Sequence, residues 1–242
     1  MRYLGIVSYD GSAYNGWQRQ PDAPSVEQAL EEVFSLILNT PITVYGSGRT
    51  DAGVHALGQT FHFDCDKKFV MKKLLLGVNS LLPKDIHVKR LKKVPSEFHA
   101  RYNATYKHYR YLINNNEYSP FQRQYAMQIR YNLDLMAIRD AMKLFIGTHN
   151  FQDFTTKDTD KDDFIRVIHR ISLSRHNGLL RIDVIGSGFM TYMVRFIVGT
   201  LVAIGQGREE ASFISKHLDQ GERHIVSYKA EPQGLYLYEV GY

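Results

Sequence analysis

The order in which strand-like and helix-like segments follow one another is the feature that most constrains the fold. Residues 2–9 alternate and are rich in β-formers, which predicts a strand. Segments that neighbour each other in sequence are expected to pair as hairpins, with helices between them, so the order predicts an α+β protein with a largely antiparallel sheet. Further strands are expected over 42–45, 59–64, 85–93, 107–114, 166–175, 179–185 and 234–240, and helices after Ser25 and over 69–80, 133–145, 191–204 and 211–218.

A similar order of elements occurs in both parts of the chain. We therefore expect two fused, similar α/β halves, residues 1–105 and 106–242. No Gly/Ser-rich or proline-rich stretch separates them, so one catalytic unit without a flexible linker is predicted.

Length and composition exclude several classes of protein. The chain has 242 residues and a single cysteine, Cys65, which suits a reducing cytoplasm. The sequence begins MRYLGIVSYD, which is typical of a strand and not of a signal peptide. The most apolar run, FIVGTLVAIG at 196–205, is too short to span a bilayer. A cytoplasmic protein is expected.

Positive charge is concentrated in one segment. From Lys67 to Arg110 there are twelve Lys or Arg and two acids, a formal charge of +10 within a chain of net charge +5. Such a block is typical either of a solvated face or of a polyanion-binding surface. Tyr102, Tyr106, Tyr109 and Tyr111 lie among the cations, and stackable rings beside phosphate-binding groups favour RNA or single-stranded nucleic acid.

The stretch GSGRTDAGVHALGQT, residues 46–60, carries one carboxylate, Asp51, in a loop with several glycines. Gly48 and Gly53 allow tight turns and a close backbone approach by a ligand. The alternative is a turn-forming aspartate that bonds its own backbone.

A helix in the second half offers a partner for this carboxylate. The segment TYMVRFIVGTLVAIG is apolar nearly all round, which predicts a buried helix, and Arg195 is its only charge. A buried guanidinium keeps its proton and needs an acceptor. We expect Asp51 and Arg195 to pair at the floor of a cleft between the halves; the alternative is that Arg195 reaches a helix end or pairs elsewhere.

Other candidate sites have weaker patterns. His62, Asp64 and Asp66 alternate as metal ligands can, but a solvent-facing strand edge also alternates, and no metal is expected. Asp51 and His55 suggest an acid–base pair, but no companion nucleophile motif and no phosphate-binding glycine motif accompanies them. Trp17 is expected to support the site structurally.

Several ordered motifs closely resemble the tRNA pseudouridine synthase A family over nearly the whole chain. The most specific is GRTDAGVHA, within residues 46–59. The others are YDGSAYNGWQRQ, SVEQALEEV, LLPKDIHV, FHARYNATYKHYRY, GTHNFQDF, GSGFMTYMVRFIVGTL and EPQGLYLYEVGY.

The resemblance implies the pseudouridine-synthase fold, in which the two halves share one continuous, largely antiparallel sheet and enclose a central cleft. It implies an isomerase that converts uridine to pseudouridine at positions 38, 39 and 40 of the tRNA anticodon stem-loop. It also implies a homodimer that uses no metal or organic cofactor. By position, Asp51 matches the catalytic aspartate, which acts as nucleophile or base, and Arg49 matches the arginine of its loop. Tyr109 matches the tyrosine that stacks on the target uracil, and Arg195 the arginine that pairs with the aspartate. Basic residues between Lys67 and Arg110 would bind the tRNA backbone.

Three positions depart from the family pattern. Asn150 replaces a frequent aspartate, Phe196 a common asparagine, and Ser47 a frequent alanine. Asn150 and Phe196 leave a changed target nucleotide, in a paralogue with a narrowed specificity, as an open alternative. A tRNA-binding or chaperone module of the same fold without turnover is the second interpretation, and a hydrolase that uses Asp51 and His55 is the third.

Overall fold

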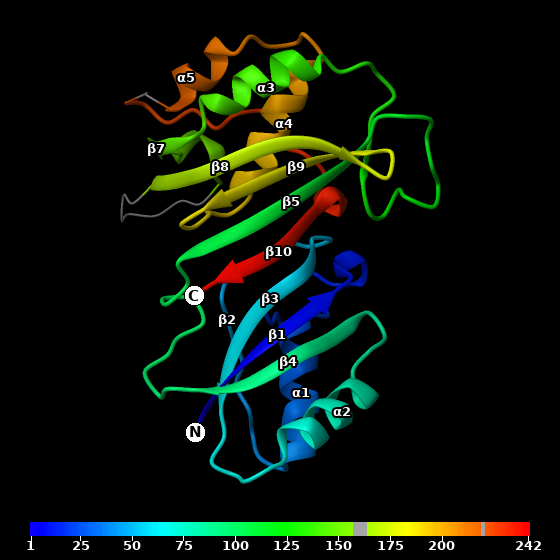
Figure 1. The fold of residues 1–242 in the computed structure, drawn as a ribbon, viewed down its shortest axis with the longest axis vertical. Helices are drawn as coiled ribbons and strands as arrows, with labels where there is room; N and C mark the ends of the chain where they lie inside the picture. The colour runs from blue at the N-terminus through cyan, green and yellow to red at the C-terminus, as the bar shows by residue number, and fades with distance from the viewer. Residues whose placement is uncertain (157–163, 219–220) are drawn as a thin grey trace. The chain divides into compact units, whose positions relative to one another are not determined.

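The computed structural model describes residues 1–156, 164–218 and 221–242, and the chain forms two compact units (Figure 1). Unit 1 contains Met1–Thr105 together with Tyr236–Tyr242, and unit 2 contains Tyr106–Leu235. Residues 236–242, which the sequence analysis assigns to the second half, thus belong to the first unit. Among the described residues, no helix has the length and apolarity that a membrane span needs.

Unit 1 is built on a sheet with the strand order β4-β1-β3-β10. The pairs β1–β3 and β1–β4 are antiparallel, whereas β10 runs parallel to β3, and the short β2 pairs with β3 antiparallel. The elements are β1 (Arg2–Tyr9), η1 (Gly11–Ala13), α1 (Val26–Leu38), β2 (Tyr45–Gly46), β3 (His55–Asp64), α2 (Met71–Leu81), β4 (Ile86–Val94) and β10 (Leu235–Gly241).

Helix α1 forms the core of unit 1 against β3. Ser25 caps the helix, because its side-chain oxygen accepts a hydrogen bond from the backbone N–H of Gln28. Phe34 on α1 packs against Phe61 and Phe63 of β3, with ring centroids 5.9 and 4.8 Å apart. Since side chains alternate along a strand, His62 lies on the opposite face of the sheet.

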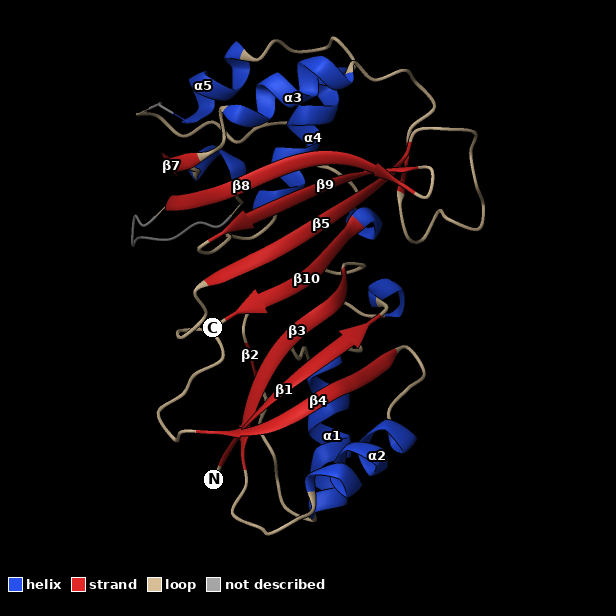
Figure 2. Cartoon of the chain, in the orientation of Figure 1, coloured by secondary structure: helices blue, strands red, loops and turns tan. Residues whose placement is uncertain are grey.

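Unit 2 has the strand order β5-β9-β8-β7, and these neighbours are all antiparallel (Figure 2). The short β6 pairs with β5 in parallel. The elements are β5 (Tyr106–Asn114), β6 (Met127–Gln128), α3 (Leu135–Lys143), β7 (Gly147–Asn150), η2 (Gln152–Phe154), β8 (Ile165–His176), β9 (Leu179–Gly186), α4 (Met193–Gly205), α5 (Ser212–Leu218) and η3 (Pro232–Gly234).

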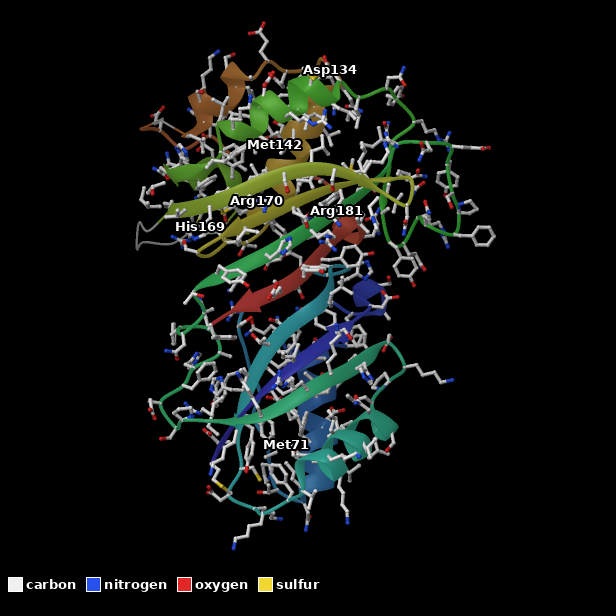
Figure 3. All side chains as sticks on the ribbon, viewed as in Figure 1. Met71, Asp134, Met142, His169, Arg170 and Arg181 are labelled. Atoms are coloured by element: carbon white, nitrogen blue, oxygen red, sulfur yellow. The ribbon has the colours of Figure 1, made fainter. Side chains whose placement is uncertain are left out.

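Helix α4 is the core element of unit 2, and every one of its residues is buried. Helix α3 packs on α4 and carries the buried Met142; its cap is Asp134, whose Oδ1 accepts from the backbone N–H groups of Met136 and Ala137 (Figure 3). The prediction of a buried helix here is confirmed.

The face of β9 that carries Asp183 is polar. Asp183 Oδ1 accepts hydrogen bonds from His108 Nε2 at 2.7 Å and Arg110 Nε at 2.9 Å. Arg181, labelled in Figure 3, lies with its Nε 2.8 Å from Asp183 Oδ2, at an angle that does not make a hydrogen bond. The two hydrogen-bonding side chains lower the pKa of Asp183, against the effect of its burial.

The predicted α+β class with largely antiparallel sheets is confirmed, as is the hairpin of β8 and β9. Its turn has positive φ at Asn177 (48°) and Gly178 (81°), as an Asn-Gly hairpin turn requires. The continuity of the sheet between the halves and the central cleft concern the relation of the two units, and they stay predictions.

The strand expected over 42–45 is wrong for most of its length. Backbone N–H groups of Ile42 and Val44 donate to the side chains of Ser35 and Glu31 on α1, so this stretch is held by a helix and not by a ladder. Strand pairing begins only at Tyr45.

Candidate active site

The loop that carries Asp51 connects β2 to β3, and side chains of β3 tie its first part down. Ser47 Oγ donates to Gln59 Oε1 at 2.7 Å, and Gln59 Nε2 donates to the carbonyl of Gly48 at 2.7 Å. The backbone N–H of Ser47 donates to the carbonyl of Thr60 at 2.8 Å. Ser47 and Gln59 are fully buried, so this end of the loop is rigidly attached to the sheet.

A second loop, which follows η1, supports the middle of the Asp51 loop. The backbone N–H of Trp17 donates to the carbonyl of Thr50 at 3.1 Å, and that of Gly53 donates to the carbonyl of Tyr14 at 3.3 Å. Gly16 has φ +92°, and a Cβ there would lie 2.5 Å from the Thr50 carbonyl oxygen. The two loops are in backbone contact, which only glycine allows at this position.

Trp17 fills the space beneath the loop, as expected for structural support. It is 1% exposed, and its Nε1 donates to Glu27 Oε1 at 3.1 Å. A Cβ on Gly46 would lie 2.6 Å from the indole. Burial raises the pKa of Glu27, whereas the Arg19 backbone N–H, the indole and the charge of Arg49 act in the opposite direction. Arg49 itself is exposed.

Asp51 is held by its own backbone at the entrance to β3. Its carbonyl accepts from the N–H of Val54 at 3.1 Å, and Gly53 inside this turn has φ +75°. Asp51 is half-buried and stands on a loop that is fixed at both sides. This arrangement can present one carboxylate to a substrate in a fixed position.

His55 stabilises the base of the same loop. It is 2% exposed, it stacks on Tyr236 of β10 with centroids 4.7 Å apart, and its Nδ1 accepts from the Gly11 N–H at 3.1 Å. Nδ1 also lies 3.1 Å from Asp10 Oδ1. An ion pair there would need a proton on Nδ1, and the backbone N–H already occupies that position, so we infer that Nδ1 is an acceptor. His55 thereby joins three segments of unit 1.

Arg195 lies in the first turn of α4 in unit 2. It is 8% exposed, its Nε donates to the carbonyl of Ala230 at 2.8 Å, and its guanidinium lies 5.2 Å from the centroid of the Tyr192 ring. Lys229 Nζ lies 4.5 Å from the same centroid. Tyr192 therefore contacts two cations.

Sequence reasoning missed Tyr192 and Lys229. Tyr192 stands before α4 with φ +62°, a left-handed conformation that costs a tyrosine roughly 1–2 kcal/mol. Such strain is frequent at functional sites. The local sequence carries no signal for this conformation, because Thr191, a residue type that often caps helices, stands directly before Tyr192.

Tyr109 lies on β5 of unit 2, opposite Val184 of β9. It is 7% exposed, and its ring meets Phe189 edge-on with centroids 5.1 Å apart. Tyr111, on the same face of the strand, donates its hydroxyl to the carbonyl of Glu231, and burial raises its pKa. The edge-on contact with Phe189 helps to hold the Tyr109 ring in place.

The departures from the family pattern have local explanations. Asn150 Oδ1 accepts from the N–H of Gln152 at 3.0 Å, a turn bond that an aspartate makes in the same way. Phe196, on α4, is 3% exposed and therefore packs in the core of unit 2. Neither contact changes the predicted site residues.

The structure assigns other partners to the residues considered for metal binding. Asp64 accepts two hydrogen bonds from Arg2, at 2.9 and 2.7 Å, and His62 Nδ1 accepts from the Ala100 N–H at 3.2 Å. Within the described parts of the chain, no group of three or more His, Cys, Asp or Glu is arranged to hold a metal ion.

Most of the basic block lies on the surface of unit 1, whereas Lys107 and Arg110 belong to β5 of unit 2 and are half-buried. The exposed members are Lys67, Lys68, Lys72, Lys73, Lys84, Lys89, Arg90, Lys92, Lys93 and Arg101. The structure thus brings Arg49, Asp51 and ten exposed cations into one unit and places Tyr109 and Arg195 in the other.

An α+β fold with largely antiparallel sheets, one carboxylate on a rigidly held loop and ten exposed cations in the same unit are typical of an enzyme that acts on a polyanion such as RNA. Comparison with known proteins gives the family: the model of the tRNA pseudouridine synthase family matches residues 6–103 and 141–242, and this chain belongs to that family of isomerases. The predicted fold and enzyme class are thereby confirmed.

Three curated relatives show the extent of the likeness; each is named tRNA pseudouridine synthase A. The protein from Exiguobacterium sp. is 38% identical over 98% of this chain and 96% of its own length. The one from Shewanella piezotolerans is 40% identical over 100% of this chain and 93% of its own. The one from Streptococcus mutans is 38% identical over 100% and 99%.

Proposed function

We propose that this chain isomerises uridine to pseudouridine in tRNA, with Asp51 as its only catalytic carboxylate. The observation that carries the proposal is the Asp51 loop, which β3, the Trp17 loop and its own turn all hold in place. Family membership and the names of the relatives support the reaction and the tRNA substrate.

The reaction explains why a single carboxylate suffices. The bond between C1′ and N1 of the uracil breaks, the base rotates, a bond forms between C1′ and C5, and the C5 proton is replaced by one on N1. No group passes to water, so the second carboxylate of a glycosidase has no role. Asp51 either attacks C1′ or removes the C2′ proton. Exclusion of water protects the cleaved base from loss.

The remaining site residues have proposed roles from the same chemistry. Arg195 pairs with Asp51 and keeps the carboxylate ionised and oriented. Tyr109 stacks on the uracil, which has left its stack at a cost of a few kcal/mol. Arg49, exposed beside Asp51, takes the place that the base vacates in the RNA.

The finer features of the function are proposals of the same kind. The target uridines are positions 38, 39 and 40 of the anticodon stem-loop, and the enzyme acts as a homodimer in the cytoplasm. Identification of the modified positions in total tRNA tests the target uridines, and sedimentation of the purified protein tests the homodimer.

The experiment that tests the proposed function compares the wild type with Asp51→Asn on a tRNA transcript, with chemical labelling of pseudouridine. The substitution keeps the shape of the side chain and removes its charge, so product should fall below detection while tRNA affinity changes less than about threefold, since a carboxylate adds no phosphate contact. Asp22→Asn, at an exposed position of unit 1, is the matched control and should keep full activity.

Each alternative function predicts a different outcome of this experiment. Product formation by Asp51→Asn would exclude the role assigned to Asp51. Free uracil as the product would favour the hydrolase, and tight tRNA binding by a wild type without any product would favour the binding module.

A further inference from the structure

Four rings form a continuous row on unit 1, on the face of the sheet opposite α1. We call Tyr45, His62, His99 and Tyr102 the ring row. Tyr45 and His62 are opposite each other on β2 and β3 and stack at 4.9 Å between centroids, with an interplanar angle of 17°. His62 meets His99 edge-on at 4.6 Å, and His99 meets Tyr102 at 4.3 Å and 36°.

Hydrogen bonds from the 95–105 segment fix the two imidazoles. His62 Nδ1 accepts from the Ala100 N–H, and His99 Nδ1 accepts from the Arg101 N–H at 3.1 Å. Asn103 clamps the backbone of His99, because its Oδ1 accepts from the His99 N–H at 2.6 Å and its N–H donates to the His99 carbonyl at 3.0 Å. The rings are therefore ordered before any ligand binds.

The two ends of the ring row are open to solvent, although its centre is not. Tyr102 is 76% exposed and Tyr45 is 48% exposed, whereas His62 is 1% exposed. Packing of the core accounts for His62 but gives no reason for a tyrosine at position 102. The guanidinium of Arg101 lies 5.8 Å from the centroid of the Tyr102 ring, so a cation accompanies the exposed end.

The imidazoles of the ring row are neutral near pH 7. Burial, then His99 and the charge of Arg2, lower the pKa of His62 to about 4, with Asp64 acting in the opposite direction. Burial, Arg2 and Arg101 lower the pKa of His99 as well. The rings thus offer uncharged π faces, while Arg101 and the exposed lysines of unit 1 supply the positive charge. Single-stranded nucleic acid is bound by this combination of rings and cations.

We propose that the ring row stacks an unpaired base of the RNA substrate, at a site separate from Asp51. The loop leaves β2 directly after Tyr45 and Gly46, but Asp51 itself lies at the His55 end of β3, where its carbonyl accepts from the Val54 N–H. His62 follows His55 by seven residues on β3, which at about 3.3 Å per residue is about 20 Å along the strand. About 20 Å corresponds to roughly six stacked nucleotides, so the base on the ring row is not the base that reacts. The inference rests on the proposed function only in taking RNA as the ligand.

The test measures the affinity of the full-length protein for a tRNA transcript at fixed salt, by fluorescence anisotropy. Tyr102→Ala should weaken binding about tenfold, within a range of roughly five- to hundredfold, and Tyr102→Phe should bind like the wild type because it keeps the ring. The matched control is Tyr131→Ala, a tyrosine of unit 2 that is 73% exposed; it should bind like the wild type. Unchanged melting temperatures show that all variants fold.

A second arm uses transcripts that each lack one base. One abasic position should weaken binding by the wild type but have no further effect on Tyr102→Ala, which identifies the stacked base. The inference is overturned if Tyr102→Ala binds as tightly as the wild type, or if Tyr131→Ala loses as much affinity as Tyr102→Ala. In the first case the exposed rings would be better explained by a protein partner.

The outcomes separate this inference from the proposed function. Pseudouridine formation with no effect of Tyr102→Ala on affinity contradicts the ring row alone. A Tyr102→Ala effect in a wild type that forms no pseudouridine contradicts the proposed reaction and leaves the ring row standing as an RNA-binding site.

Discussion

The imidazole of His62 is buried, and its surroundings keep it neutral near pH 7. It accepts a backbone hydrogen bond at Nδ1, it is covered by Tyr45 and His99, and Arg2 lies close enough to oppose a second proton. A protonated imidazole could not accept the Ala100 N–H at Nδ1, so acid is expected to break the contact that attaches the 95–105 segment to β3.

Stability of unit 1 should therefore fall with acidification between about pH 6.5 and pH 4. An unfolded histidine binds its proton near pH 6.5 and folded His62 near pH 4, so in this interval the unfolded chain holds more protons and a lower pH favours unfolding. The total effect is on the order of 3 kcal/mol. Urea unfolding followed by fluorescence of Trp17, the single tryptophan, reports on this unit.

The substitution His62→Asn should reduce this dependence on pH, because an amide oxygen accepts the same bond without titrating. His87→Asn, at an exposed position of β4, is the control and should keep the slope of the wild type. An unaltered slope in His62→Asn would show that other groups cause the acid sensitivity.

At this scale the sequence predicts candidate site residues from a motif, but not the contacts that support them. Asp51 and Arg49 stand in a specific motif, and glycines with positive φ or close contacts mark its turns. The hydrogen bond between Trp17 and Glu27 joins a loop to a helix. A local sequence pattern does not show that these two side chains meet. Tyr192 has a positive φ although tyrosine has no intrinsic preference for it, so local sequence does not predict this conformation.

Among the described helices, α4 has the least room for larger side chains, because every one of its residues is buried. The segment 228–230 lies directly against it, because the carbonyl of Arg195 accepts from the Ala230 N–H and a Cβ on Gly199 would lie 2.4 Å from the Tyr228 carbonyl oxygen. The sequence identified this helix from its apolar composition, but it could not show which segment covers the glycine.

Gly199→Ala should destabilise unit 2 by roughly 1–3 kcal/mol. The gain in helix propensity, about 1 kcal/mol, is outweighed by overlap with a backbone oxygen that cannot move without shifting the 228–230 segment. Thermal unfolding by circular dichroism measures the change.

Gly77→Ala in α2 is the matched control for that substitution. Its nearest neighbour would be Ile37 Cδ1 at 3.5 Å, an ordinary contact, so the free energy of unfolding should rise by up to about 1 kcal/mol. A Gly199→Ala protein as stable as the wild type would mean that the 228–230 segment adjusts at little cost.

At the scale of the whole molecule, charge is distributed unevenly. Ten exposed cations of the basic block lie in unit 1, whereas the net charge of the chain is only +5. RNA binding that depends on phosphate contacts releases counterions, so the affinity should fall linearly with salt on logarithmic axes.

The double substitution Lys92→Gln/Lys93→Gln on β4 should reduce the slope of that plot by about 0.7–0.9 for each phosphate contact that is lost. Lys143→Gln/Lys216→Gln, two exposed lysines of α3 and α5, removes the same charge outside the block and should leave the slope nearly unchanged. Titration of a tRNA transcript at four salt concentrations gives both slopes; identical slopes in the two variants would mean that only net charge matters.

The assignment of β10 to unit 1 is where sequence reasoning reached its limit for the molecule as a whole. A strand over 234–240 is predictable from its alternation, but its neighbour is not, because the choice among possible partners depends on the assembled unit. His55 stacks on Tyr236, and β10 pairs with β3 next to the Asp51 loop.

Because β10 pairs with β3, unit 1 is complete only late in synthesis. The ribosome makes β3 and its loop early, but their neighbour β10 follows only after residues 106–235, a delay on the order of 10 s at ordinary translation rates. During that interval the edge of β3 beside the loop lacks its partner and is open to pairing with other nascent chains. Asp51 and its loop are translated early. We expect them to gain their last supporting strand only when nearly all of the 242 residues have been translated.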